Sequence, residues 1–413
     1  MKPTVRRIVR VMILTVVVGS IRGVQAGDLN PPPGSINPTM KDLNTVEPRI
    51  PVNAATTPGD AGATFKIIAS GSYYLTGNLL GEVGKVGIEI TASSVTLDLM
   101  GFELKGVAGA TDGIRGNPVD QHTLDIRNGT FREWPGAGVD VGIARTSIVR
   151  DIRAIACGGS GIKIAGASIV ERCVSAGTVA TGIEAGQHCR VLDCVANNNA
   201  RGFGVGGRSV VQGCVAQSNT GNGIETGGNA TVMNCTAITN GAGIVVLGQS
   251  SVLDSVANSS TIGDGISVGY AAIVRGCVST LNADDGIAAT NNGVRISDCS
   301  VSINTGDGIE VLADSFIVDN KVDGNATGIL VTGIDNRIDG NAVTDSLGSG
   351  VRVTGTENLI VHNTASGNAP NYDIAADNFG VYLSATIAGA AVFGASGGAT
   401  VEPTNSNWAN LSY

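Results

Sequence analysis

Hydrophobic and polar residues alternate over short runs along most of this chain, as in SVVQGCVAQ at 209–217 and GIEVL at 308–312. Alternation with a period of two predicts β-strands that are buried on one face. The runs are separated by Gly, Asn and Asp, which leaves no room for helices between them. The pattern therefore predicts an all-β chain built from short strands.

Three sets of residues recur with one period of 20–22 residues. The first is a Gly followed by an apolar residue, and its apolar members are Ile162, Ile183, Phe203, Ile224, Ile244, Ile266, Ile287, Ile309, Ile329 and Val351, with looser echoes at Ile88, Ile114, Val139 and Ile374. The second column is Cys173, Cys194, Cys214, Cys235, Ser255, Cys277, Cys299, Asn320, Asn341 and Asn363. The third is Asn199, Asn219, Asn240, Ser260, Asn282, Asn304, Asn325, Ser346 and Asn368.

Columns that share one period require equivalent residues to lie above one another. Each period is then one coil of short strands, and successive coils stack about 4.8 Å apart as parallel sheets. We predict a right-handed parallel β-helix of about 12 coils, each of 20–22 residues. A solenoid of helix pairs is excluded because the chain has 60 glycines in 413 residues, and each costs about 1 kcal/mol inside a helix.

The columns have physical causes. Ile and Val of the first column are expected to stack in the core. Asn is expected to adopt the left-handed turn conformation and to hydrogen-bond its amide along the axis. The Gly before the apolar residue leaves no Cβ to collide with the next coil.

The eight cysteines would suggest disulfides in an exported protein. Side chains in register between adjacent coils, however, lie farther apart than a disulfide allows. Ser and Asn also replace Cys within the same column. We therefore expect free, buried thiols, including Cys157 and Cys189, which lie outside the column.

Both ends of the chain depart from the period. Aromatic residues are only 4% of the chain, yet they gather near the two ends, at Tyr73, Tyr74, Phe379, Tyr382, Phe393, Trp408 and Tyr413. Because a bare terminal coil exposes unpaired strand edges, these segments are predicted to be caps. We predict a proline-rich lead-in at 27–64, the β-helix at 65–378 and a C-terminal cap at 379–413.

Residues 1–26 have the features of a secretory signal peptide, with basic residues, an apolar run at 11–18 and small residues before a cleavage point at Ala26. An uncleaved membrane anchor is the alternative. No second long apolar run follows. We expect a monomer that is secreted to the periplasm or beyond and has no membrane span after cleavage.

Charge limits the partners. The formal net charge is −9, and removal of residues 1–26 would take away five basic residues and leave −14. So acidic a surface repels phosphate backbones, which excludes nucleic acid. An acidic polysaccharide would be repelled as well, unless a divalent cation bridges it to the protein.

The repeated GDGI and VxxCxxxxxN phrases resemble the right-handed β-helix repeats of the pectate-lyase-like (pectin lyase fold) superfamily. GSYYLTGNL at 71–79, GIEITASSVTLDLMGFEL at 87–104 and IRNGTF at 126–131 look like the opening coils of secreted bacterial members. The resemblance covers roughly residues 65–378 and implies the fold. It does not imply one activity, since the superfamily includes lyases, hydrolases, epimerases and adhesins.

Aspartates align within the period. Asp264, Asp285 and Asp307 precede the glycine in three consecutive coils, and Asp284 and Glu310 lie beside them. Carboxylates in register would lie about 5 Å apart and would need a bound cation or shared protons. Asp264, Asp285, Asp307 and Glu310 are therefore a candidate Ca²⁺ site. The alternative is ordinary turn chemistry, because Asp before Gly is common in turns.

Two catalytic hypotheses use these carboxylates. Polygalacturonases resemble the stretch in which IGDGI, with Asp264, is followed one coil later by NADDGI, with Asp284 and Asp285. The resemblance implies hydrolysis by paired carboxylates. The Gly-His-Gly of that family is missing, since the corresponding coil reads GDGI at Asp307, and RIS at 295–297 matches only part of its Arg-Ile-Lys.

A polysaccharide lyase would instead abstract a proton with a base, often with Ca²⁺ neutralising a uronate. Arg275 and Arg295 lie in the coils beside the aspartates and are the candidate bases. The alternative for both is a solvated surface charge.

Two classes of function remain. The first is a secreted protein that binds glycan or other cell-envelope material through the face of its solenoid. The second is a carbohydrate-active enzyme, a Ca²⁺-assisted lyase rather than a hydrolase. The first is favoured because the sequence offers no complete catalytic set.

Overall fold

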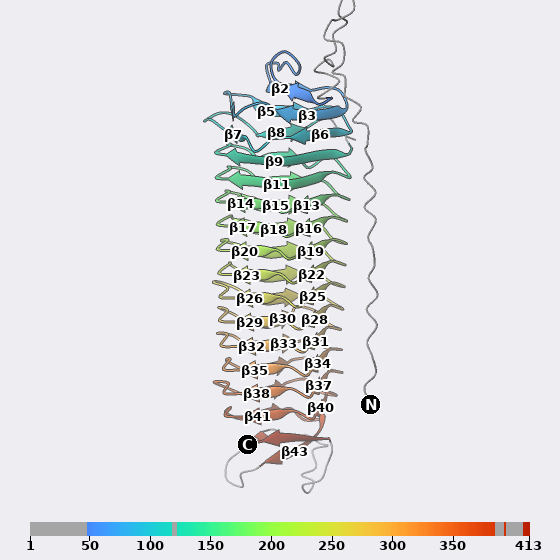
Figure 1. The fold of residues 1–413 in the computed structure, drawn as a ribbon. Helices are drawn as coiled ribbons and strands as arrows, with labels where there is room; N and C mark the ends of the chain where they lie inside the picture. Colours follow the sequence, from blue (N-terminus) through green and yellow to red (C-terminus); the bar gives the residue numbers. More distant parts are fainter. Residues whose placement is uncertain (1–47, 118–121, 385–391, 394–407) are drawn as a thin grey trace, which may run out of the picture. The chain divides into compact units, whose positions relative to one another are not determined.

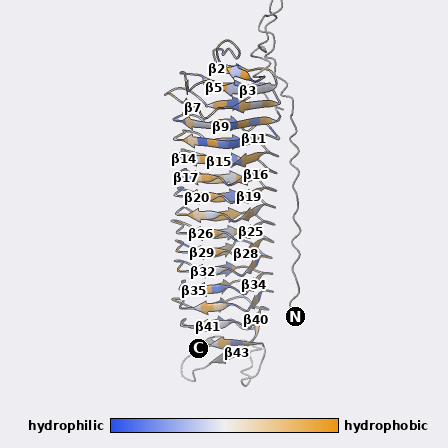
Figure 2. Cartoon of the chain, in the orientation of Figure 1, coloured by the Kyte–Doolittle hydropathy of each residue, from blue (hydrophilic) through white to orange (hydrophobic). Residues whose placement is uncertain are grey.

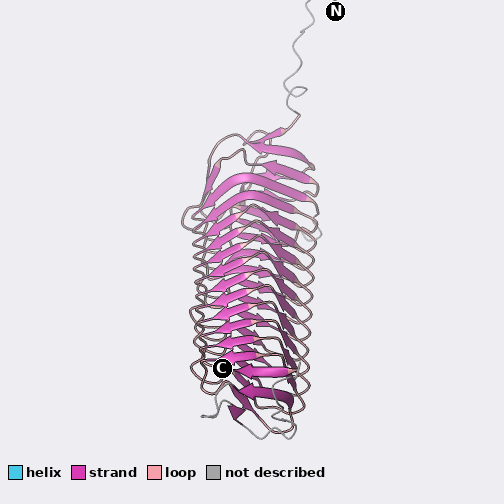
Figure 3. Cartoon of the chain, turned by 60° about the horizontal axis from the view of Figure 1, so that its bottom comes forward, coloured by secondary structure: helices cyan, strands magenta, loops and turns pink. Residues whose placement is uncertain are grey.

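The computed structural model describes residues 48–117, 122–384, 392–393 and 408–413, and its compact unit spans 49–413. Within the described residues every regular element is a β-strand (Figure 1), and no helix occurs (Figure 3). The strands form two parallel sheets that run from coil to coil. The prediction of an all-β solenoid of stacked coils is confirmed.

One sheet takes a single strand from each coil and has 16 strands. In order they are β2 (Ala63–Ile67), β5 (Val86–Ile90), β8 (Ile114–Gly116), β10 (Val139–Val141), β12 (Ile162–Ile164), β15 (Thr181–Ala185), β18 (Arg201–Val205), β21 (Ile224–Thr226), β24 (Ile244–Val246), β27 (Ile266–Val268), β30 (Ile287–Ala289), β33 (Ile309–Val311), β36 (Ile329–Val331), β39 (Val351–Val353), β42 (Tyr372–Ile374) and β44 (Val392–Phe393). The predicted Gly-Ile steps lie in register here, and Ile266, Ile287 and Ile309 pair in sequence.

The other sheet has 29 strands in two columns. The first column is β1 (Ile50–Val52), β3 (Gly71–Leu75), β6 (Val95–Asp98), β9 (Leu124–Arg132), β11 (Ile148–Ile155), β13 (Ile169–Glu171), β16 (Arg190–Leu192), β19 (Val210–Gln212), β22 (Thr231–Met233), β25 (Ser251–Leu253), β28 (Ile273–Arg275), β31 (Arg295–Ser297), β34 (Phe316–Val318), β37 (Arg337–Asp339), β40 (Leu359–Val361) and β43 (Phe379–Ser384). The second column is β4 (Leu79–Leu80), β7 (Glu103–Lys105), β14 (Val174–Ala176), β17 (Val195–Asn197), β20 (Val215–Gln217), β23 (Thr236–Ile238), β26 (Val256–Asn258), β29 (Val278–Thr280), β32 (Ser300–Ser302), β35 (Lys321–Asp323), β38 (Ala342–Thr344), β41 (Thr364–Ser366) and β45 (Ala409–Ser412). β9 and β11 are long enough to pair with both columns and so join them.

The 16 strands of the first sheet correspond to about 16 coils, so the predicted count of 12 is too low. The extra coils lie at the ends. Near the N-terminus, Phe65 pairs with Ile88 and Ile88 with Ile114, spacings of 23 and 26 residues that the shorter period does not detect. Near the C-terminus, the residue in register with the Gly-Ile step is Tyr372 rather than Ile374.

The first predicted column forms the core. All ten of its regular members, from Ile162 to Val351, are fully buried. Burial of one such side chain contributes roughly 1.5–3 kcal/mol, and the contribution repeats in every coil. Hydrophobic and hydrophilic residues alternate within single strands, as β9 and β11 show in Figure 2.

Buried asparagines form ladders along the axis. Asn219 Nδ2 donates to Asn240 Oδ1 at 2.8 Å, and the backbone N–H of Asn219 donates to the same oxygen at 3.1 Å. The second column is hydrogen-bonded in the same way, with Asn320 Nδ2 donating to Asn341 Oδ1 at 2.9 Å. The predicted stacking of amides is confirmed.

The predicted left-handed conformation of these asparagines is wrong. The positive φ belongs to the residue before each ladder position: Leu281 (φ 57°) precedes Asn282, and Ile303 (φ 55°) precedes Asn304. A left-handed residue turns the chain so that the next side chain points into the coil. The β-branched Ile303 adopts this conformation at a cost, which the buried amide contacts offset.

All eight cysteines are buried and free, as predicted. The thiols of the second column lie against backbone carbonyls, and Cys194 Sγ is 3.1 Å from the oxygen of Leu192. Burial raises the pKa of the Cys157 thiol to about 11. These groups therefore fill space in the core.

The stack of coils begins before residue 65, the predicted start of the β-helix. β1 pairs with β3 in register, with Ile50 opposite Tyr73, so the solenoid already includes part of the segment 27–64. Tyr73 is buried, and its hydroxyl donates to the carbonyl of Ala69 at 2.8 Å. The guanidinium of Arg49 lies over the ring of Tyr74. Residues 1–47, with the predicted signal peptide, lie outside the described residues.

The predicted C-terminal cap is described in part. Tyr382 is buried and packs edge-on against Tyr372, with ring centroids 5.1 Å apart. Phe379, Trp408 and Tyr413 are more than half exposed. Phe393 belongs to β44, but its side chain lies outside the described set, as do residues 385–391 and 394–407.

The glycine before each core residue makes the close stacking possible. A Cβ on Gly223 would lie 2.6 Å from Asn240 Nδ2 and 2.8 Å from the carbonyl oxygen of Gly243 in the next coil. A real Cβ does not approach backbone so closely. The predicted role of these glycines is confirmed.

We expect Gly223→Ala to destabilise the protein by about 1–3 kcal/mol, because the added methyl group must push the next coil away. Gly77→Ala is the matched control, since a Cβ at Gly77 would meet nothing within 4 Å. Thermal and urea unfolding of both variants measure the effect. Equal stability of the two variants would contradict the close-stacking explanation.

Candidate functional site

Charge is distributed unevenly along the solenoid. Residues 101–210 contain 12 basic and 10 acidic residues, whereas residues 211–320 contain 2 basic and 10 acidic residues. The second segment holds every candidate site residue of the sequence analysis. Its surface is therefore strongly anionic around the aspartates.

The structure brings three of the five predicted carboxylates within ligand distance of one another, and Asp307 and Glu310 are not part of that group. Asp264 precedes β27, Asp284 and Asp285 precede β30, and Asp307 precedes β33 of the 16-stranded sheet. One ligand oxygen each from Asp264, Asp284 and Asp285 lie within 4.8 Å of one another. We call Asp264, Asp284, Asp285, Asp307 and Glu310 the acidic cluster.

Two of these aspartates also act as turn residues. Asp285 Oδ1 accepts a hydrogen bond from the backbone N–H of Asp307 at 2.7 Å. Asp307 Oδ1 in turn accepts one from the backbone N–H of Thr327 at 3.2 Å. The turn role that the sequence analysis kept as an alternative therefore uses one oxygen of each carboxylate. The second oxygen of each is not part of these two contacts.

Burial and like charge shift two pKa values upward. Burial raises the pKa of Asp285 to about 7, the N–H of Asp307 opposes this, and the carboxylates of Glu310, Asp264 and Asp307 add to it. Burial, and then the charge of Asp284, raises the pKa of Asp264. Only 9% of Asp285 is exposed. Near neutral pH, a bound proton or a bound cation would therefore relieve the repulsion between these carboxylates.

No basic side chain neutralises the acidic cluster within the described part of the chain, where none of its five members forms an ion pair. Arg275 ends β28 and Arg295 begins β31, both in the 29-stranded sheet, and both are exposed. Along the coil, β29 and two corners separate Arg275 from Asp285. The two arginines therefore lie on the 29-stranded sheet, whereas the aspartates lie at the start of strands of the 16-stranded sheet.

The acidic cluster borders a flat floor on the outer face of the 16-stranded sheet. The outward residue at the centre of three neighbouring strands is small: Val245 in β24, Ser267 in β27 and Ala288 in β30. Tyr270, half exposed, closes the other edge, and its ring occupies the space that a Cβ on Gly248 would need. Its hydroxyl donates to Gln249 Oε1 at 3.3 Å.

A depression of about 370 Å³ adjoins this floor on the N-terminal side. It exists because Gly204 lies between Glu184 and Glu225 in the register of the sheet and has no side chain. Arg201 Nη1 lies 3.2 Å from Glu225 Oε2 and lines the depression with both glutamates.

The sequence analysis did not select Glu184, Arg201, Glu225 or Tyr270. A signal for the depression was present in RGFGV at 201–205, where the neighbouring coils read TGIEA and NGIET. The change from Glu to Gly at one outward position opens the surface. Nothing in the spacing of Tyr270 marks it, because its position depends on Gly248 in the preceding coil.

A protein-family model for the right handed beta helix region matches residues 66–237 and 224–405, most of the chain. The chain belongs to this family. Membership confirms the predicted right-handed parallel β-helix, but it specifies no activity.

Solved structures of other right-handed β-helix proteins are similar at low identity. The A-module of mannuronan C-5 epimerase AlgE6 from Azotobacter vinelandii is 15% identical, with a TM-score of 0.45, over 83% of this chain and 91% of that one. The periplasmic alginate epimerase AlgG is 12% identical, with a TM-score of 0.34, over 87% and 80%. Tailspike protein 3 of bacteriophage CBA120 is 11% identical, with a TM-score of 0.42, over 81% and 66%.

No curated protein matches the chain. A search of the described residues for a helix long and apolar enough to cross a membrane found none.

The raised pKa of Asp285 predicts a dependence of stability on pH in the presence of a chelator. An ordinary aspartate has a pKa of 3.8, so between about pH 4 and 7 the folded state binds a proton that the unfolded state lacks. The stabilisation is complete below about pH 4, falls by about 1.4 kcal/mol per pH unit between about pH 4 and 7, and is gone once the pH has risen through 7. Thermal unfolding at pH 5 to 8 measures it.

Asp285→Asn should flatten this pH dependence, because Asn still accepts the hydrogen bond from Asp307 but cannot titrate. Asp314→Asn is the control, since Asp314 is exposed and its φ of 56° suits Asn. The assignment fails if Asp285→Asn keeps the full pH dependence.

Proposed function

We propose that this protein binds an extended acidic polysaccharide on the outer face of its 16-stranded sheet, and that Ca²⁺ in the acidic cluster bridges protein and glycan. The observation that carries the proposal is the convergence of Asp264, Asp284 and Asp285 within 4.8 Å beside a flat floor. Asp307 and Glu310 would complete the set of ligands.

The donor set suits Ca²⁺. Ca²⁺ binds oxygen ligands at about 2.3–2.6 Å, so two oxygens on one ion lie at most about 5 Å apart. The separations in the cluster meet this limit. All the donors are carboxylates, which hard cations prefer. When bound, the ion supplies positive charge to a surface that otherwise repels a polyanion.

The floor suits a sugar chain. Val245, Ser267 and Ala288 present no long side chain, so a flat ring can approach the sheet. Tyr270 offers an apolar ring with a polar tip at its edge. These three side chains lie in successive coils, so a chain of sugar rings laid along the axis can contact all three. These features support binding of an elongated ligand rather than a compact one.

A second function uses the same groups catalytically. A buried carboxyl with a pKa near 7 beside other carboxylates is the arrangement of a general acid in glycosidases. Asp285 would donate the proton, and Asp264 or Asp307 would act as its partner. A lyase that uses Arg275 or Arg295 has less support, because both arginines lie on the other sheet.

The proposal also requires that the protein meets its glycan outside the cytoplasm, as the signal-like residues 1–26 indicate.

Calorimetric titration with CaCl₂ at pH 8 should reveal binding with a Kd of the order of 10⁻⁴ to 10⁻³ M, the range of extracellular calcium modules. The double variant Asp264→Asn with Asp285→Asn should lose this binding, because two of the converging carboxylates are gone. Asp314→Asn removes one charge elsewhere and should bind as the parent protein does. Loss of binding in the control as well would indicate diffuse electrostatics rather than a site.

Co-sedimentation with polygalacturonate or alginate should depend on Ca²⁺ and be weakened at least tenfold by the double variant, since the bridge is removed. A neutral glucan tests whether the acidic group is needed.

The same incubations are assayed for reducing ends and for the absorbance of unsaturated sugars. Products that disappear in Asp285→Asn would favour the enzyme over the binding protein. If no acidic glycan is retained and none yields products, both the binding function and the enzymatic function are excluded.

A further inference from the structure

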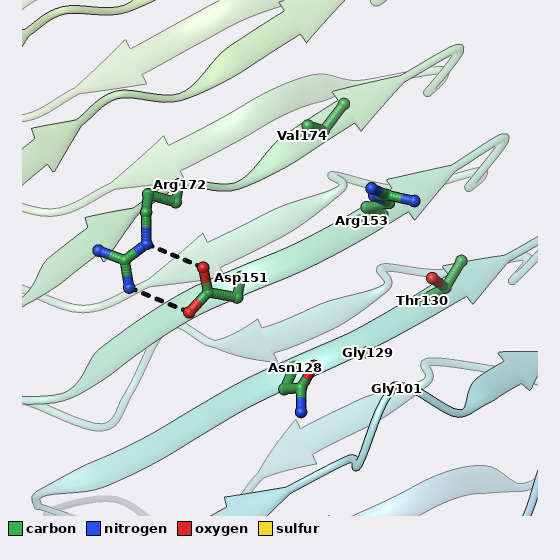
Figure 4. Close-up of a pocket in the computed structure, with 8 residues that line it drawn as sticks. All are labelled: Gly101, Asn128, Gly129, Thr130, Asp151, Arg153, Arg172 and Val174. Carbon is green, nitrogen blue, oxygen red and sulfur yellow. Dashed lines mark hydrogen bonds and ion pairs between the residues drawn. The ribbon is translucent and has the colours of Figure 1, made fainter.

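A second polar depression lies on the 29-stranded sheet, in coils that precede the acidic cluster (Figure 4). Its volume is about 400 Å³. Two columns of side chains bound it. One consists of Asn128, Asp151 and Arg172, and the other of Thr130, Arg153 and Val174. Members of the second column pair in register across β9, β11 and β14.

The floor of the depression is made of backbone. Gly129 lies in the middle of β9 between the two columns, and Gly101 lies beside it in the preceding coil. A Cβ on Gly129 would meet Leu99, so the position must be glycine. A side chain at 129 would point into the core, as that of Ile152 does in the next coil, so only backbone lies between the two columns on the outer surface.

An ion pair between Arg172 and Asp151 fixes the first of these two columns. Arg172 donates from Nε to Asp151 Oδ1 at 2.9 Å and from Nη2 to Asp151 Oδ2 at 3.0 Å. This two-pronged pair lowers the pKa of Asp151. Both carboxylate oxygens are engaged, so the pair adds no net charge. Asn128 Nδ2 donates to Asp98 Oδ1 at 3.3 Å, which orients the amide.

The opposite wall carries an uncompensated cation. Arg153 is exposed and forms no ion pair within the described part of the chain. The hydroxyl of Thr130, its neighbour in register, has no hydrogen-bond partner among the described side chains and backbone. The depression therefore has one net positive charge in a protein of formal net charge −9.

We propose that this depression binds the acidic group of an anionic sugar, a hexuronate or a sulfated hexose, without Ca²⁺. Arg153 pairs with the carboxylate or sulfate, since a guanidinium offers two parallel donors to such groups. Thr130 and the oriented Asn128 contact sugar hydroxyls. The volume exceeds that of a bare inorganic anion and lies in the range of small-molecule sites. This site lies on the other sheet and does not depend on the acidic cluster.

Binding is measured by calorimetry in excess EDTA with trigalacturonate, glucose 6-sulfate and glucose as probes. We expect the two anionic probes to bind and glucose not to bind. Arg153→Ala should weaken binding about tenfold or more, because a hydrogen-bonded charge is lost. Asp151→Asn should strengthen it, since the lining then loses its one carboxylate, and Asn tolerates the φ of 54° at this position.

Arg190→Ala is the matched control. Arg190 is an exposed arginine of β16 that does not line the depression, so the net charge changes equally. The double variant Asp264→Asn with Asp285→Asn should bind these probes as the parent protein does, which separates this site from the calcium-dependent face. A preference between the two anions identifies the acidic group. Equal losses in Arg153→Ala and Arg190→Ala, or no anion binding by the parent protein in EDTA, would overturn the proposal.

Discussion

Each coil of this protein rests directly on the next, and every other feature depends on that contact. The strands supply backbone hydrogen bonds between coils, the glycines before the core residues let the coils approach, and the asparagine amides continue the bonding inside. Because side chains lie above their equivalents, any residue type repeated at the period becomes a column. The same rule that stacks isoleucine in the core stacks aspartate at the surface, where like charges must then be neutralised.

The periodic part of the fold could be predicted from the sequence. Residues 162–351 repeat closely enough that the core column, the amide ladders and the free thiols all follow from spacing. The end coils could not be counted, because loops such as the one between Ile88 and Ile114 lengthen the period without breaking the stack. The sequence predicts the left-handed conformation at the asparagine, but the residue before it adopts this conformation. The column shows which residue is repeated and not which residue turns the chain.

The candidate sites differ in the same way, because some of them follow from the repeat and others do not. The convergence of Asp264 with Asp285 follows from register alone, and the sequence predicted it. The depression beside Glu184 depends on Gly204, which interrupts a column of outward side chains. A repeat is read from what recurs, so an opening made by one missing side chain escapes it. The exposed Arg275 and Arg295 show the converse, because closeness in sequence to the aspartates does not place them on the same sheet.

The buried thiols have a practical consequence. Six of the eight cysteines occupy one column between residues 173 and 299, and none is exposed. A membrane-impermeant alkylating reagent can modify such a sulfur only while its own coil is open. The column therefore constitutes a built-in series of reporters, spaced along the stack, from which the order of opening under denaturant or force can be mapped by mass spectrometry without adding any label to the protein.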